Sequence, residues 1–490
     1  MSDKLALNRL FTDHMVLQRD RSVPVWGTGA DGVEVTVRCQ DVSARTVVRN
    51  GEWKVSLPAL HAGGPFELVA EGGEDRIVLR DVLVGDVWLA GGQSNMEWRI
   101  AVSANPEREV AEADWPTLRF YDVPRVAYDD GQAHAGAWTV CTPETASEIS
   151  AVGYHFARTL IGALDVPIGI IGCNWGGTSA SCWVPEESIA GDPDLRVYLD
   201  EYRGTIAAQG PGDVERLEAE YQAQVDEFVR KEQAGYKGEE LGYFPWPPPM
   251  SERSFLRPNG LYGTMLEPTV PYGIKGFIYY QGESDANRAG TYDKLLGIMI
   301  AKWRADWGDE SLPFLFVQLP GYGDGTDREH DTFNWPNLRE AQQRVTEQVR
   351  DAFMAVILDC GEELDIHPKN KRPVGERLAG IALGEVYGRD VSCYGPMFRE
   401  LDIDGGKAIV RFAHAESGLV APGGELLGFE IAGSDGRFVP AEAKIVGGAV
   451  EASSTAVPAP SAVRYAWASW PEVTLFGGNG LPAAPFRSDR

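Results

Sequence analysis

The fold is decided by the stretch Asp86-Val87-Trp88-Leu89-Ala90, which leads directly into Gly91-Gly92-Gln93-Ser94-Asn95-Met96. The apolar run is too continuous for a strand with one face in water, which predicts a strand buried on both faces. Other runs of the same kind follow, and segments of helical period separate them. Apolar strands joined by helical crossovers indicate an α/β fold with a parallel sheet covered on both faces. The expected strands are Asp86–Ala90, Pro167–Cys173, Ile274–Tyr280, Pro313–Leu319 and Phe353–Asp359, and the expected helices are Ala151–Leu164, Tyr292–Trp307, Asn337–Arg350 and Val374–Tyr387.

The regions on either side of this pattern have a different character. Residues 1–85 hold short alternating runs between Gly, Asp and Asn turns, which predicts an N-terminal β-sandwich or jelly-roll-like domain. Residues 86–390 then form the α/β domain, and residues 391–490 return to short strands as a C-terminal β-rich region. A segment at about residues 192–256 predicts an insert, helical at first and Pro-rich at its end.

The charge of the chain argues against several kinds of partner. Lys and Arg number 45 against 72 Asp and Glu, a formal net charge of −27 at pH 7. Such a field repels phosphate backbones and anionic lipids, so neither nucleic acid nor a membrane is an expected partner. No apolar run approaches the ~18 residues of a membrane span, and the N-terminus lacks the apolar core of a signal peptide. Six cysteines without metal-ligand spacing are typical of buried thiols in a reducing compartment. We therefore expect a cytoplasmic protein, although a chain trimmed of its leader would look the same; its oligomeric state is left open.

Polar residues follow the first and the last of the expected strands, and ligands of parallel sheets bind at the carboxyl ends of the strands. Ser94 lies on a glycine-flanked turn, where a hydroxyl is exposed close to backbone N–H groups, as a nucleophile requires. A serine that caps the next helix would fit the same position. His367 is one of only seven histidines and lies two residues after Asp365. An imidazole beside a carboxylate predicts a general base, although an isolated histidine is otherwise usually an ordinary core or surface residue.

The two middle segments supply groups that could stabilise a negative charge. Gly176 and Gly177 follow one strand, and adjacent glycines let a peptide N–H approach a ligand closely. Gln281 and Glu283 follow the next strand; Gln281 could donate to an oxyanion and Glu283 could orient a base, or both could make local hydrogen bonds. A serine, oxyanion donors and an Asp/His pair at one sheet edge are the parts that acyl transfer needs.

The sequence resembles the sialate O-acetylesterases, which are SGNH-type hydrolases related to acetylxylan esterases. The resemblance extends from the N-terminal β region to the C-terminus, with the insert the least similar part. It implies a flavodoxin-like, three-layer SGNH hydrolase fold between the two β-rich regions. The motifs that carry it are Gly92-Gln93-Ser94-Asn95-Met96, Trp175-Gly176-Gly177-Thr178, Tyr280-Gln281-Gly282-Glu283-Ser284 and Asp365-Ile366-His367-Pro368.

The resemblance also implies roles for these residues. Ser94 would be the nucleophile and His367 the general base and acid. The backbone N–H groups of Ser94 and of Gly176 or Gly177, together with the Gln281 amide, would form the oxyanion hole.

This chain departs from the wider superfamily in two places. The superfamily usually has Asp-x-x-His where this chain has Asp365-Ile366-His367, and it usually has Asn at the position of Gln281. The group that orients His367 is therefore left open between Asp365, Glu283 and a backbone carbonyl.

Together these features predict a serine carbohydrate esterase that removes O-acetyl groups from sugars through an acetyl-enzyme on Ser94. It would be sialate 9-O-acetylesterase-like, with an O-acetylated carbohydrate as partner and no metal or organic cofactor. An acetylxylan or other plant-glycan esterase is the alternative, as is a non-catalytic glycan-binding protein on the same scaffold. Sugar rings could stack on the aromatic residues near the four motifs, which are Trp98, Trp175, Trp183, Tyr280 and Trp335.

Overall fold

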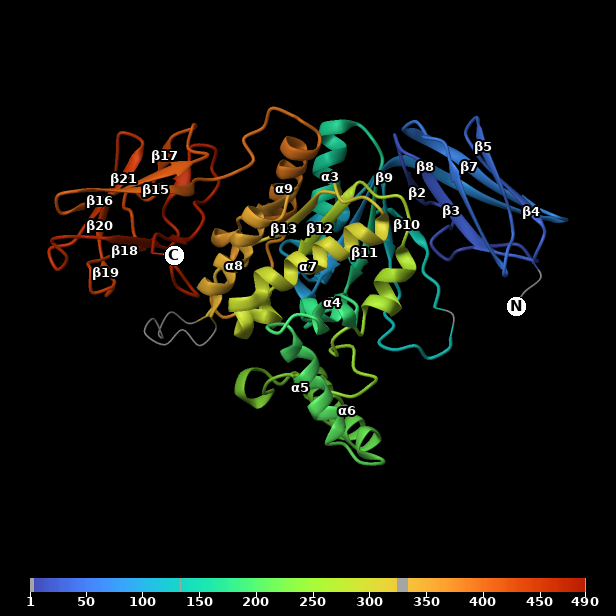
Figure 1. Ribbon diagram of the computed structural model, residues 1–490, viewed down its shortest axis with the longest axis horizontal. Coiled ribbons are helices and arrows are strands. Elements are labelled where there is room, and N and C mark those ends of the chain that lie inside the picture. Colours follow the sequence, from blue (N-terminus) through green and yellow to red (C-terminus); the bar gives the residue numbers. More distant parts are fainter. Residues whose placement is uncertain (1–3, 133, 324–333, 490) are drawn as a thin grey trace. The chain divides into compact units, whose positions relative to one another are not determined.

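The structure is a computed structural model that describes residues 4–132, 134–323 and 334–489 (Figure 1). The chain divides into two compact units. The first comprises Met1–Val123, Ala135–Gly177 and Pro271–Arg490, and the second comprises Pro124–His134 and Thr178–Val270. Every residue of the predicted site belongs to the first unit.

An 11-stranded mixed sheet forms the core of the first unit. The strands along its main path, in spatial order, are β10 (Trp138–Cys141), β9 (Trp115–Asp122), β11 (Ile168–Asn174), β8 (Asp75–Gly92), β12 (Gly276–Tyr280), β13 (Phe314–Val317) and β14 (Ala352–Ala355). Neighbours from β9 to β14 are parallel, and β10 is antiparallel to β9. Leu89 of β8 pairs with Ile171 on one side and with Phe277 on the other, so β8 lies in the middle of the sheet. The predicted α/β class and the predicted parallel strands are confirmed.

The five parallel strands predicted from the sequence lie in the flavodoxin-like order. Numbered along the chain, β8, β11, β12, β13 and β14 lie in the spatial order 2-1-3-4-5, and β9 and β10 extend the sheet beyond β11. Gly169 of β11 lies against Val16 of β2 (Val16–Gln18) and Trp138 of β10, since a Cβ there would lie 2.9 Å from Val16 and 3.1 Å from the Trp138 ring. The three-layer arrangement stays a prediction.

Three long helices connect strands of this sheet, and a fourth follows its last strand. The three are α3 (Ala151–Leu164), α7 (Ala289–Trp307) and α8 (Trp335–Gln348), and the fourth is α9 (Arg372–Ile381). The helix α3 has the predicted bounds because the Ser150 hydroxyl accepts a hydrogen bond from the Gly153 N–H and caps its start. The helices pack as pairs, α3 on α9 and α7 on α8. Their buried aromatic rings contact the strands, as where Phe156 meets Trp88 edge to face at 5.1 Å between centroids.

The N-terminal residues form strands, as their alternating pattern predicts. One sheet joins β1 (Ala6–Leu7), β3 (Val23–Thr28) and β6 (Glu52–Leu57). The strands β2 (Val16–Gln18), β4 (Glu34–Cys39), β5 (Val42–Val47) and β7 (Gly63–Gly72) belong to the large sheet through β8. The 18-residue strand β8 runs straight through residues 85 and 86, so the expected domain boundary falls inside a strand rather than in a linker.

The C-terminal region is also built of short strands. They are β15 (Met397–Asp404), β16 (Lys407–Ala413), β17 (Leu419–Val420), β18 (Phe429–Ala432), β19 (Val439–Pro440), β20 (Glu442–Val446), β21 (Ala449–Ser453), β22 (Ala462–Tyr465), β23 (Phe476–Gly477) and β24 (Phe486–Arg487). Their pairings are antiparallel, and Phe486 stacks on Phe398 to close the core of this region.

The second unit contains the segment predicted as an insert. Its helices are α4 (Glu186–Ala190), α5 (Arg196–Ala207) and α6 (Asp213–Gln233), drawn in green in Figure 1. None of the residues of α6 is buried, which fits its Glu- and Gln-rich sequence. The Pro-rich stretch Phe244–Pro249 lies outside any helix or strand.

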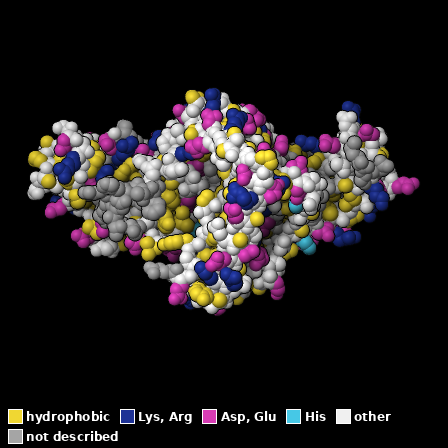
Figure 2. All heavy atoms as spheres, turned by 90° about the horizontal axis from the view of Figure 1, so that it is seen from below, with side chains coloured by type: hydrophobic (Ala, Val, Ile, Leu, Met, Phe, Trp, Pro, Cys, Tyr) yellow, Lys and Arg dark blue, Asp and Glu magenta, His cyan; other side chains and the backbone are white. Residues whose placement is uncertain are grey.

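The surface charges are mixed rather than segregated on the face that Figure 2 shows, where acidic and basic side chains alternate. In the described part of the chain, no helix combines the length and the apolar character needed to cross a bilayer. All six cysteines are free thiols.

Candidate active site

Ser94 follows the carboxyl end of β8 on a turn that only glycine permits. Gly92 has φ +131°, and a Cβ on it would lie 2.2 Å from the carbonyl oxygen of Tyr280. This close approach lets the Gln93 N–H donate to the Tyr280 carbonyl at 3.0 Å. Ser94 is the first residue of the short helix α1 (Ser94–Glu97), and Ser94 itself is half-buried at the edge of the sheet.

The structure brings Ser94 and His367 together from positions 273 residues apart in the chain. The Ser94 Oγ lies 2.8 Å from the Nε2 of His367. His367 is in the loop between β14 and α9, and its side chain remains 29% exposed. A hydroxyl at this distance from an imidazole nitrogen can pass its proton directly to the ring.

The His367 ring is held by a neighbouring indole and by its own loop. Trp98 stacks on it, with centroids 4.9 Å apart and planes at 12°. The Asp365 carboxylate accepts the backbone N–H of His367 at 2.9 Å and lies 3.8 Å from Nδ1. Burial, and next the charge of Lys371, lower the pKa of His367 below its ordinary 6.5, so the ring favours its neutral form.

In the described part of the chain, no hydrogen bond joins Glu283 to the His367 ring. Its Oε1 accepts the side-chain amide of Asn95 at 2.6 Å, and its other oxygen is buried without a hydrogen-bond partner. Burial raises the pKa of this carboxyl. Of the two carboxylates considered from the sequence, Asp365 is therefore the one beside the imidazole.

Gly176 and Gly177 lie beside the nucleophile, as the sequence suggests. A Cβ on Gly176 would lie 3.3 Å from the Ser94 Cβ and equally close to Glu97 Oε2. The Gly176 N–H is occupied, because it donates to that Glu97 oxygen at 2.8 Å. Within the described residues, the N–H groups of Ser94 and Gly177 have no hydrogen-bond acceptor. Gly177 has φ +74°, a conformation that favours glycine.

Gln281 is placed differently from what an oxyanion donor requires. Its side chain is only 1% exposed, and its amide donates to Asp285 at 2.6 Å. The hydroxyl of Tyr292 donates to the Gln281 side-chain oxygen at 2.8 Å. To reach a substrate, the Gln281 amide would have to leave this buried hydrogen-bond network. Its role as an oxyanion donor stays a prediction, and these contacts do not favour it.

The aromatic residues near the motifs separate into two groups. Trp183, Tyr280 and Trp335 are buried in the core and offer no face to a sugar. Trp98 and Trp175 are half-exposed, and Trp98 already covers one face of His367.

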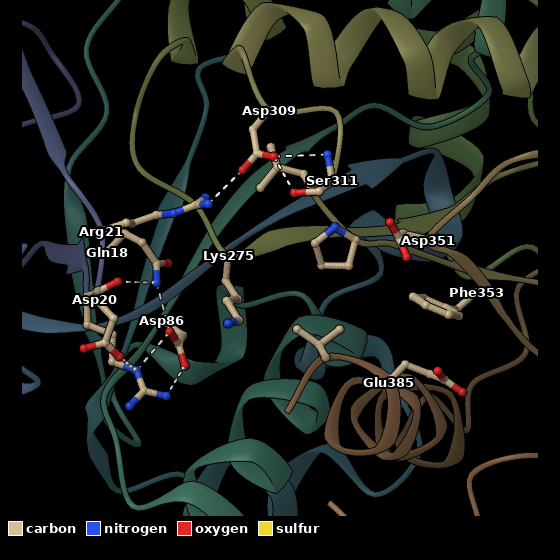
Figure 3. A pocket seen from close by; sticks show the side chains of 14 residues that line it. Gln18, Asp20, Arg21, Asp86, Lys275, Asp309, Ser311, Asp351, Phe353 and Glu385 are labelled. Carbon is tan, nitrogen blue, oxygen red and sulfur yellow. Dashed lines mark hydrogen bonds and ion pairs between the residues drawn. The ribbon is translucent and has the colours of Figure 1, made fainter. Parts of the chain in front are cut away.

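A cavity of about 380 Å³ lies at the opposite edge of the sheet, at the amino ends of its strands (Figure 3). Two arginines pair with carboxylates among its lining residues. Arg19 binds Asp86 at 2.9 Å, and Arg21 binds Asp309 at 2.7 Å. These pairs tie the segment between β2 and β3 to β8 and to the loop after α7, so we assign this cavity a structural role.

A pair of Glu97 variants tests whether this side chain holds the glycine loop. Glu97→Ala removes the acceptor of the Gly176 N–H, so we expect kcat/KM for an aryl acetate to fall about 10-fold as the loop loses its position. Glu97→Gln keeps an amide oxygen at the same place and should stay within about 3-fold of the parent protein. Equal rates for the two variants would show that the hydrogen bond to Gly176 does not matter.

Comparisons with known proteins identify the family of this chain. The family described as "Carbohydrate esterase, sialic acid-specific acetylesterase" matches residues 84–243 and 250–383. Sialate O-acetylesterase of Mus musculus is 26% identical over 97% of this chain and 92% of the mouse protein, and that of Homo sapiens is 26% identical over 96% and 90%. The crystal structure of a carbohydrate acetylesterase from Xanthomonas citri superposes with a TM-score of 0.81 at 36% identity, covering 99% of both chains.

These similarities define the protein as a carboxylic ester hydrolase. The contact between Ser94 and His367 at the edge of the sheet is consistent with that class. The chain belongs to the sialic acid-specific acetylesterase family of carbohydrate esterases. The resemblance noted in the four sequence motifs is thereby confirmed.

Proposed function

We propose that this protein hydrolyses O-acetyl groups of carbohydrates through an acetyl-enzyme on Ser94. The observation that carries the proposal is the 2.8 Å contact between Ser94 Oγ and His367 Nε2 at the carboxyl edge of the sheet. In the first step the Ser94 oxygen attacks the acetyl carbonyl while His367 takes the hydroxyl proton. His367 then returns that proton to the sugar oxygen, which leaves as an alcohol. Water, deprotonated by His367, attacks the acetyl-Ser94 ester and releases acetate.

The oxyanion of each tetrahedral intermediate needs donors that are not already used. The N–H groups of Ser94 and Gly177 fit this requirement, whereas the Gly176 N–H is engaged by Glu97. A strong oxyanion donor contributes about 3 kcal/mol to the stability of the transition state. Asp365, 3.8 Å from Nδ1, is the group that would orient His367 and stabilise its charged form.

The substrate class follows from the family and from the charges around the site. The curated relatives are named sialate O-acetylesterases, which supports an acetylated sialic acid as substrate. A sialic acid carries a carboxylate, and the carboxylates of Glu97 and Asp365 lie beside the reacting groups. Acetylated neutral glycans such as xylo-oligosaccharides therefore remain the second candidate.

Acetate release from a panel of esters tests the proposal. The full chain would be assayed with O-acetylated sialosides, acetylated xylo-oligosaccharides and an aryl acetate. We expect hydrolysis of the aryl acetate and of at least one of the two sugar classes. Absence of acetate release from every ester would overturn the proposed activity.

The pH dependence of kcat/KM should reflect the lowered pKa of His367. The ring must be neutral to accept the Ser94 proton, so activity falls as pH drops through the His367 pKa in the free enzyme. Because burial and Lys371 lower that pKa, the acid inflection should lie below pH 6.5. A rate profile with an aryl acetate measures it, and an inflection above pH 6.5 would contradict the assigned base.

A further inference from the structure

Lys371 is a buried lysine next to the reacting groups, and the steps above do not use it. It precedes α9, four residues after His367, and is only 2% exposed. Its Nζ donates a hydrogen bond to the side-chain oxygen of Asn95. The same nitrogen lies 5.7 Å from the Trp98 ring centroid and 5.6 Å from that of Tyr280. Burying an ammonium group is costly, so such a residue calls for a functional explanation.

Asn95 links this lysine to the catalytic pair. Its amide group donates to Glu283 Oε1 at 2.6 Å and to the backbone carbonyl of Ile366 at 3.0 Å. Asn95 follows Ser94 in the chain, and Ile366 precedes His367, so one side chain joins the two segments that carry the reacting groups. The charges fix its orientation, since the ammonium of Lys371 faces the amide oxygen and the carboxyl of Glu283 faces the amide nitrogen.

The charge of Lys371 also acts on the imidazole. The groups that face Lys371 are Glu283, Asp365, Glu362 and Cys360, and those that face His367 are Lys371, Asp365 and Glu97. Lys371 is the cation among these neighbours of His367, and it opposes protonation of the ring. Burial lowers the pKa of Lys371 itself to about 7, so it carries its charge in the acidic range where His367 titrates.

We propose that Lys371 is a positioning residue of the esterase site. Its ammonium fixes Asn95, Asn95 holds the Ile366–His367 peptide so that the ring faces Ser94, and the same charge keeps that ring ready to accept a proton. The inference rests on the proposed function, because it concerns the base of that reaction.

Two substitutions separate the hydrogen bond from the charge. Lys371→Met removes both, and we expect kcat for an aryl acetate to fall about 10- to 100-fold with KM changed less than about 3-fold. Lys371→Gln keeps a donor for Asn95 without the charge, so its kcat should lie between those of Lys371→Met and the parent protein. In both variants the acid inflection of kcat/KM should move to higher pH by about half a unit or more, because the cation that opposes protonation of His367 is gone.

Lys369→Met is the matched control, because it removes a lysine of the same loop whose side chain is exposed. It should leave kcat and the acid inflection unchanged. The proposal is overturned if folded Lys371 variants keep the parental inflection, if their kcat equals that of the control, or if neither variant folds, which would make Lys371 purely structural. These outcomes differ from failure of the proposed function, in which the parent protein itself releases no acetate.

Discussion

Ser94→Ala is expected to reduce kcat for aryl and sugar acetates by about four to six orders of magnitude. Removing the hydroxyl abolishes the acetyl-enzyme and leaves only a residual rate from the oxyanion donors and binding. The fold should be unaffected, because the Ser94 side chain caps no helix and is half-buried. We expect the free energy of unfolding to change by less than about 0.5 kcal/mol. Steady-state kinetics and thermal unfolding of the same preparation measure the two effects.

Ser284→Ala provides the control for this substitution. Ser284 follows the neighbouring strand β12 at the same edge of the sheet, and among the described residues its hydroxyl makes no hydrogen bond. Its loss should leave kcat within about 2-fold of the parent value. Near-normal turnover by Ser94→Ala, or an equal loss in the two variants, would reject Ser94 as the nucleophile.

His367→Ala should lower kcat by about three to five orders of magnitude, because both the attack of Ser94 and the attack of water lose their base. The substitution also opens the space beside Trp98, on which the ring stacks. Added imidazole should therefore bind there and restore part of the rate, increasingly as pH rises and neutral imidazole accumulates. His61→Ala, at an exposed histidine of the N-terminal region, is the control and should keep full activity. Full activity in His367→Ala would show that His367 is not the general base.

Much of the central fold could be predicted because its strands are uniformly apolar. Asp86–Ala90 became the buried core of β8, and the expected helix Ala151–Leu164 is α3 residue for residue. The patterns missed β9, whose first half mixes exposed and buried residues and includes Pro116, and the four-residue strand β10. The order of the strands depends on which apolar faces pack together, and no local pattern encodes it.

The two reacting residues could be found because both follow strands of a parallel sheet, whose carboxyl ends share one edge. The groups that support them could not be found in this way. Asn95, Glu97 and Lys371 look like ordinary polar residues of a helix start or a loop, and their importance comes from partners far away in the chain, such as Glu283 and Gly176. Gln281 is the opposite case. Its position after β12 suggested an oxyanion donor, but its side-chain amide donates to Asp285 instead.

Trapping the covalent intermediate tests the central claim most directly. The parent protein and Ser94→Ala would be mixed with a chromogenic acetate ester, quenched in acid during the first turnovers, and analysed by intact mass and peptide mapping. The mechanism predicts one added acetyl group on the peptide that contains Ser94, formed at the rate of the chromophore burst and absent from the variant. Rapid turnover by the parent protein with no acetyl group on that peptide, or with the label on another residue, would contradict it.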